Sequence, residues 1–240
     1  MPKFRPAAVL AGGLALTLSA CSDAEPMSNQ DSGTNRPLVI IAVPDPEDST
    51  EQLVLGELYE HTMLANDREA VTDIVPSTTT DEHGVSLLSS SRADMMIGCT
   101  GDLLGAFDPV RAEELKAEIA AAEDPAAARK DVRQQVYDEL VSVLPSQYDA
   151  PDPSPAEACG GEATGLPQNI VPVFLKTSVG RTELQAMNKL GRALTTEDIE
   201  DVVADARETG SVQEAAGNYF EGAGSYPGGD VQVDSGAGPA

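Results

Sequence analysis

The alternation of apolar and polar positions predicts regular elements in the first half of the chain. Residues 38–43 form a continuous apolar run rich in β-branched residues, which is typical of a strand buried on both faces. Residues 51–64 repeat their apolar positions at helical spacing, and 70–75, 81–91 and 93–98 predict a strand, a helix and a strand. This alternation is typical of an α/β domain with a parallel sheet.

The pattern changes after residue 108. Two helices rich in Ala, Glu and Arg are expected at 110–122 and 125–144, followed by a Pro-rich loop at 145–168. A further strand and three helices are expected at 169–175, 181–192, 195–208 and 211–220. We therefore predict one α/β domain over residues 38–221 and a disordered Gly-rich tail over 222–240.

The first 20 residues have the pattern of an export signal. Lys3 and Arg5 precede a short apolar run that ends near residue 18, too short to span a bilayer comfortably. The tetrapeptide Leu-Ser-Ala-Cys that ends at Cys21 resembles the lipobox of bacterial lipoproteins, which implies acylation of Cys21 and cleavage before it. The mature chain would then be lipid-anchored in the cell membrane on its extracytoplasmic face. An ordinary secretory signal with an incidental cysteine is the alternative.

Residues 21–37 are rich in Ser, Asp, Asn and Pro and predict a disordered tether.

The composition of the chain excludes several classes of function. The chain has 15 Lys and Arg against 40 Asp and Glu, and this net charge of −25 excludes a protein that binds the nucleic-acid backbone. With two His and three Cys, a His-rich or four-cysteine metal site is excluded, and we expect no metal and no cofactor.

Enzyme motifs are not found in the sequence. It has no G-x-S-x-G, H-E-x-x-H or phosphate-binding P-loop motif. Acidic pairs such as Glu113–Glu114 fall on helical surfaces, where a solvated face explains them. We therefore expect a protein that is not an enzyme.

Four segments of the chain carry a family resemblance: residues 48–59 (DSTEQLVLGELY), 93–97, 100–104 and 169–210. In this order they are similar to segments of the quaternary-amine-binding proteins, the glycine betaine, choline and carnitine receptors of ABC importers, with 48–59 similar to the family's first helix. The resemblance implies a type II periplasmic-binding-protein fold and a non-catalytic role, in which a small quaternary amine is captured for an ABC permease subunit. Only 108–168 is available for a second lobe, so we expect one parallel-sheet lobe with the second lobe reduced or missing.

The resemblance also implies ligand-binding residues. The family holds its cation in an aromatic cage, assisted by polar residues from the first helix and from a Thr-Gly-Thr/Asp turn. The matching residues are Gln52, Thr100 and Asp102, and an acid at 102 suits a purely cationic ligand such as choline. Gln52 as a capping partner and Asp102 as a turn or cap residue are the alternatives. Tyr148, in the Pro-rich loop, is a further candidate for ligand contact.

Two cysteines stand where the family has cage tyrosines. Cys99 replaces the tyrosine before Thr-Gly, and Cys159 aligns with the second one. Because Cys21 is lipidated and the compartment is oxidising, we expect a Cys99–Cys159 disulfide, with a free thiol pair as the alternative. Such a bridge would hold the loop across the binding site. The alternative function is therefore a degenerate family member that serves as an accessory or interaction lipoprotein of the cell envelope, or one whose missing lobe comes from another chain.

Overall fold

The structure is a computed structural model that describes residues 37–42, 50–74, 88 and 93–222. These residues belong to the unit Asp31–Ala240. The expected signal sequence, lipobox, tether and Gly-rich tail lie outside the described residues, as does the helix expected at 81–91 apart from Leu88. No helix within the described ranges is long and apolar enough to cross a membrane.

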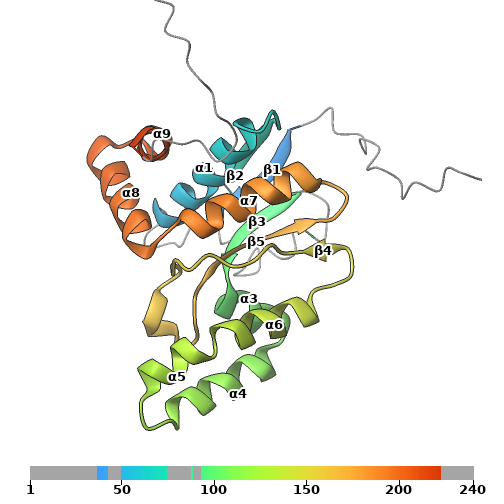
Figure 1. Cartoon of the computed structure of the whole chain (residues 1–240), viewed down its shortest axis with the longest axis vertical. Coiled ribbons are helices and arrows are strands. Elements are labelled where there is room, and N and C mark those ends of the chain that lie inside the picture. The colour runs from blue at the N-terminus through green and yellow to red at the C-terminus, as the bar shows by residue number, and fades with distance from the viewer. Residues whose placement is uncertain (1–36, 43–49, 75–87, 89–92, 223–240) are drawn as a thin grey trace, which may run out of the picture. The chain divides into compact units, whose positions relative to one another are not determined.

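A five-stranded sheet with strand order β2-β1-β3-β5-β4 forms the centre of the described unit (Figure 1). β1 (Leu38–Ala42) pairs in parallel with β2 (Ala70–Ile74) and with β3 (Met95–Cys99). β5 (Ile170–Leu175) runs antiparallel to β3, and β4 (Tyr148–Asp149) runs antiparallel to β5. The domain is α/β as expected, but its sheet is mixed.

The direction of β5 corrects the expectation of a parallel sheet. Parallel neighbours need a crossover that returns the chain to the opposite end of the sheet. Here the segment after β4 enters β5 at the end where β3 finishes, so that Ile170 pairs with Cys99 and the Thr100 N–H donates to the Asn169 carbonyl at 3.0 Å. β5 therefore runs back along β3.

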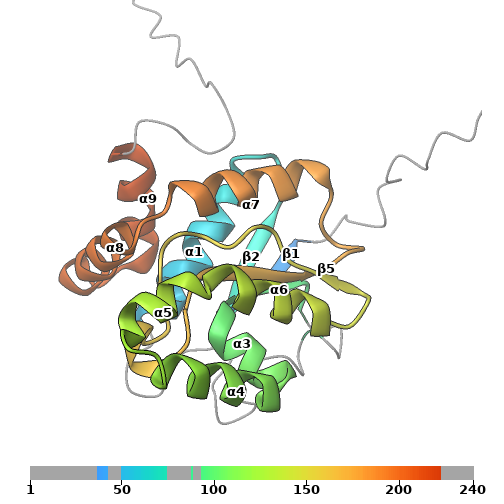
Figure 2. The same cartoon turned by 60° about the horizontal axis from the view of Figure 1, so that its bottom comes forward.

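Helices cover both faces of the sheet (Figures 1 and 2). One face packs against α1 (Thr50–Leu64), α7 (Arg181–Ala193), α8 (Thr196–Thr209) and α9 (Val212–Gly222). The other packs against α3 (Thr100–Phe107), α4 (Pro109–Ala120), α5 (Pro125–Asp131) and α6 (Arg133–Val143). In β3, Met95 and Ile97 belong to the first hydrophobic cluster and Met96 to the second, as the alternation of side chains along a strand requires.

The segment between Asp108 and Gln168 stands where a second lobe would be. It contains α4, α5, α6, the two-residue β4 and the 3-10 helix η2 (Gly161–Thr164), and this fully described segment forms no second sheet. Asp108 and Asp124 cap α4 and α5, each followed by a proline in the first turn. The single helix expected at 125–144 is interrupted at Val132, between α5 and α6.

Candidate functional site

The carboxyl ends of β1 and β3 define the place where a ligand site is expected. In the sheet, β1 lies between β2 and β3, so the order of the strands reverses at β1. Ligands of open α/β sheets bind outside the carboxyl ends of the strands at such a reversal. The first turn of α3 directly follows β3, and the first turn of α1 is the next described segment after β1.

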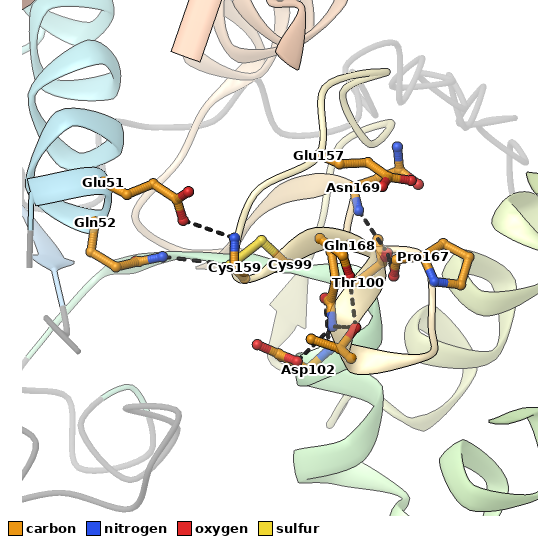
Figure 3. Close-up of a disulfide and its surroundings, with 12 residues drawn as sticks. Glu51, Gln52, Cys99, Thr100, Asp102, Glu157, Cys159, Pro167, Gln168 and Asn169 are labelled. Atoms are coloured by element: carbon orange, nitrogen blue, oxygen red, sulfur yellow. Dashed lines mark hydrogen bonds between the residues drawn. A yellow bond between two sulfur atoms is a disulfide. The ribbon is translucent and has the colours of Figure 1, made fainter. Parts of the chain in front are cut away.

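The residues that the sequence singled out lie in these two first turns. Gln52 is in α1, and Thr100 and Asp102 are in α3. Figure 3 shows the two groups at the same end of the sheet, with the Cys99–Cys159 disulfide between them. The structure therefore brings Gln52, Thr100 and Asp102 into one region, although Gln52 and Thr100 are 48 positions apart in the sequence.

The disulfide fastens the Pro-rich loop to this region. Cys99 is the last residue of β3, Cys159 lies on the loop, and their Cα atoms are 6.2 Å apart. This is the pairing that the sequence analysis expected. The backbone N–H of Cys159 donates to the Glu51 Oε1 at 2.8 Å, and the Gln52 Nε2 donates to the Cys159 Sγ at 3.5 Å. The loop is thus attached to α1 as well as to β3.

The side chains of α3 are engaged by the end of the same loop. The Gln168 Nε2 donates to the Asp102 Oδ1 at 2.6 Å, and the Gln168 Oε1 accepts from the Asp102 N–H at 3.1 Å. The Thr100 hydroxyl donates to the Pro167 carbonyl at 3.1 Å and accepts from the Asn169 N–H at 3.3 Å. Thr100 has no exposed surface and Gln168 is 1% exposed. Protein atoms therefore occupy the Thr100 hydroxyl and the Asp102 carboxylate in this structure.

A buried ion pair holds the loop from the α5 side. Arg129 is 5% exposed, and its guanidinium donates two hydrogen bonds to the Glu157 carboxylate, at 3.2 and 2.8 Å. Its Nε donates to the Leu166 carbonyl at 3.0 Å. A guanidinium satisfied in this fork geometry fixes both halves of the loop, because Glu157 and Leu166 lie on either side of the Cys159 turn.

Tyr148 does not belong to this group. It lies in β4 rather than in a loop, is 3% exposed, and packs in the hydrophobic cluster formed with α3, α4 and α6. The structure therefore does not bring its ring to the other site residues, and contact of Tyr148 with a ligand stays a prediction. An edge strand with a buried aromatic is explained by core packing alone.

The described aromatic residues form no cage at this end of the sheet. All of them pack in or against the two hydrophobic clusters: Tyr59, Phe174, Tyr219 and Phe220 in one, and Phe107, Tyr137 and Tyr148 in the other. Within the same ranges, no group of three or more His, Cys, Asp or Glu side chains is placed to hold a metal ion. What the described site offers to a ligand is polar and acidic: the amide of Gln52 and the carboxylates of Glu51 and Asp102.

Several residues of the site were missed from the sequence. Glu51 was interpreted as part of a helix start, yet it accepts the hydrogen bond from Cys159 across 108 positions. Gln168 and Arg129 are not part of any sequence motif that would have marked them as site residues. The one available signal for Arg129 was a basic residue in a helix otherwise rich in alanine, and that pattern is also typical of a solvated face.

Comparisons with known proteins bear on the fold. No family model matches the sequence, and no curated protein matches it significantly. Among solved structures, the chain is similar to apo YehZ from Escherichia coli, with a TM-score of 0.54 at 13% sequence identity, over 78% of this chain and 99% of that one. At this identity the likeness establishes a shared fold and nothing more.

Proposed function

We propose that this chain is an extracytoplasmic solute-binding lipoprotein, related to the receptors of quaternary-amine ABC importers. The observation that carries the proposal is the convergence of Gln52 and Asp102 at the carboxyl ends of β1 and β3, where the strand order reverses. These two residues stand at the positions that match the family's ligand contacts. The fold shared with apo YehZ is consistent with this assignment.

The ligand we propose is a small organic cation of the choline type. Asp102 and Glu51 both present carboxylates near the site, and a net charge of −25 attracts cations to the protein over a longer range. A zwitterion such as glycine betaine would place its own carboxylate near these acids, which is unfavourable. Choline has no carboxylate and avoids that repulsion.

The proposed partners follow from the same resemblance. A lipid on Cys21 would hold the protein at the extracytoplasmic face of the cell membrane, and an ABC permease subunit would receive the captured amine. Residues 22–37 would serve as the tether that lets the domain reach the permease.

A second candidate function is favoured by the contacts of the loop. Because Gln168 occupies the Asp102 carboxylate and Cys159 lies between α1 and α3, the polar groups of the site are engaged without a ligand. A receptor fold with its site filled in this way suits an accessory lipoprotein that binds another envelope protein instead of a solute.

Isothermal titration calorimetry of the purified lipoprotein in detergent separates the two candidates. We expect choline to bind in the micromolar range and more tightly than glycine betaine or carnitine. Asp102→Asn should weaken choline binding at least tenfold, whereas Glu197→Gln, which neutralises an exposed acid in the first turn of α8, should not. No heat of binding with any of the three amines, under oxidising or reducing conditions, would reject the solute-binding function and leave the accessory role.

A further inference from the structure

The turn from Cys159 to Gly165, which we call the flap, has an unusual backbone. Cys159 has a φ of 54°, Gly160 of 78°, Gly161 of 52° and Gly165 of 80°. Glycine adopts these left-handed angles freely, but a residue with a Cβ does so at a cost. Cys159 is therefore held in a conformation it disfavours, and its disulfide to Cys99 is the covalent bond that holds it there.

The flap is weakly attached compared with the segments on either side of it. Ala156, Ala158 and Leu166 are almost fully buried, whereas Gly160 and Ala163 are exposed. A segment with few buried apolar contacts opens locally at a low free-energy cost. The glycines at both ends of the flap supply the backbone freedom for such an opening without disturbing Ala158 or Leu166.

The flap contacts Glu51 and Gln52 directly, and it reaches Asp102 through the side chain of Gln168. The Cys159 Sγ accepts a hydrogen bond from Gln52, and the Cys159 N–H donates one to Glu51. At the other end, the Thr164 hydroxyl accepts from the Gln168 Nε2 at 2.8 Å, the same nitrogen that donates to Asp102. Movement of the flap would therefore release Gln52. It would also remove the Thr164 hydroxyl from the Gln168 Nε2, which would then keep only its hydrogen bond to Asp102.

We propose that the Cys99–Cys159 disulfide is a redox-controlled latch: exchange with a dithiol reductant outside the cytoplasm frees the flap, releases Gln52 and removes the Thr164 contact of Gln168, the residue that covers Asp102. The effect on ligand capture rests on the proposed solute-binding function. The release of the flap does not, because it concerns the disulfide and the contacts of residues 159–165, whether or not the site binds a solute.

The exchange proceeds by attack at Cys159. Cys99 has no exposed surface and Cys159 is partly exposed, so a thiolate of the reductant attacks the Cys159 Sγ and the Cys99 sulfur leaves. Cys99 is the N-cap of α3, and the positive end of that helix offsets part of the cost of burying the departing thiolate, which then takes a proton. The second thiol of the reductant displaces Cys159 from the mixed disulfide. The products are two protein thiols and the disulfide of the reductant, a transfer of two electrons and two protons.

Hydrogen exchange of the lipoprotein in detergent, before and after treatment with dithiothreitol, tests the latch. We expect reduction without denaturant, at least tenfold faster exchange in peptides covering 159–165, and unchanged exchange in β3 and β5. The Cys99→Ser/Cys159→Ser double variant should exchange like the reduced protein. The latch is overturned if reduction requires denaturant, if exchange in the flap rises less than twofold, or if β3 and β5 loosen together with it.

Choline titration of the same samples distinguishes the latch from the proposed function. At least tenfold tighter binding after reduction supports both. A flap that opens without choline binding in either state supports the latch and rejects the solute-binding function. Equal choline affinity in the oxidised and reduced protein overturns the gating of the site.

Discussion

The side chains of Gln168 and Asp102 meet directly, with the Gln168 Nε2 donating a 2.6 Å hydrogen bond to the Asp102 Oδ1. The Gln168 Oε1 also accepts a hydrogen bond from the Asp102 N–H in the first turn of α3, across 66 positions of the chain. The Gln168 side chain thus bonds both to an N–H of the first turn of α3 and to the Asp102 carboxylate. The end of the loop is therefore a structural part of α3 as well as the cover of the candidate site.

Truncation of Gln168 tests this dual role. Gln168→Ala removes the hydrogen bonds of this side chain to the Asp102 N–H and to its carboxylate in a partly buried place, so we expect a loss of about 1–3 kcal/mol in the free energy of unfolding. The matched control is Gln134→Ala, which removes an exposed amide bonded to Asp138 on α6 and should change stability by less than about 0.5 kcal/mol. Urea unfolding measures both. Equal effects of the two variants would contradict a structural role for the Gln168 contact.

The close approach of α3 to the loop predicts opposite effects for two glycines of the same helix. A Cβ on Gly101 would lie 2.7 Å from the Leu166 Cβ and 2.7 Å from the Pro167 carbonyl, while a Cβ on Gly105 meets nothing within 4 Å. Gly101→Ala should therefore destabilise the protein by about 1–3 kcal/mol through overpacking. Gly105→Ala should stabilise it by about 0.5–1 kcal/mol, because alanine is the better helix former.

Thermal unfolding of the two variants, followed by circular dichroism, gives the comparison. A Gly101→Ala variant as stable as the wild type would mean that the loop is not seated on α3 as described. Gly105→Ala reports on helix propensity alone and excludes a general intolerance of α3 to alanine.

The ion pair beneath the loop predicts a large effect for one arginine and a small one for another. Arg129→Met removes the partner of the Glu157 carboxylate, whose side chain is 19% exposed, and the guanidinium donor of the Leu166 carbonyl, so we expect a loss of about 1–3 kcal/mol. Arg192→Met removes an exposed pair with Asp152 and should cost less than about 1 kcal/mol. If Arg129→Met costs no more than Arg192→Met in urea unfolding, the loop is not anchored through Glu157.

Local pattern was sufficient for much of the fold. The apolar run of β1 and the helical periodicity of α1, α7, α8 and α9 placed these elements within one or two residues of their bounds. Their signals are strong because each element buries a regular set of its own residues. The predicted direction of β5 was wrong. The direction depends on the path of the loop that precedes the strand and not on the residues within it.

The candidate site was predicted only where a family resemblance marked its residues. Gln52 and Asp102 lie in one region, and their contact with a ligand stays a prediction; the Cys99–Cys159 disulfide agrees with the pairing expected for an oxidising compartment and three cysteines. The engagement of Asp102 by Gln168 has no local signal, since partners 66 positions apart leave no periodicity in the sequence. Tyr148 was misplaced for a related reason: a two-residue strand inside a Pro-rich segment is too short to be recognised from alternation.

Lipidation at Cys21 predicts where the protein is found in the cell. If Cys21 carries the anchor, the wild-type chain should fractionate with the membrane and incorporate a labelled fatty acid. Cys21→Ser should do neither, because serine lacks the thiol to which the lipid would be attached. Cys99→Ser/Cys159→Ser controls for loss of cysteine as such and should remain in the membrane fraction. Label that persists in Cys21→Ser would contradict the assignment.

The packing of α1 against α9 predicts that stability falls as the pH is lowered below neutral. The His61 ring stacks on Phe220 with centroids 5.8 Å apart, and burial lowers the pKa of His61 below its ordinary value of 6.5, a shift that the nearby Glu60 partly opposes. In the window between the folded-state pKa and 6.5, the unfolded chain binds a proton at this site that the folded chain does not. The free energy of unfolding therefore rises with pH through this window, and the contribution is complete above 6.5.

We expect that acidification from pH 7.5 to 5.5 destabilises the wild type more than a His61→Leu variant, as measured by urea unfolding at each pH. The comparison is made in a His83→Gln background, so that His61 is the one histidine of the chain that titrates. Burial raises the pKa of Glu57, an effect to which Glu60 adds, and this shift acts in the opposite direction, since protonation of a carboxyl with a raised pKa stabilises the fold as the pH falls. Because the His61 Nε2 lies 4.0 Å from the Glu57 Oε2, the difference between the two proteins reports the titration of His61 together with its effect on Glu57. An equal slope in both would mean that the His61 ring is as well solvated in the folded chain as in the unfolded one, and that α9 does not cover it.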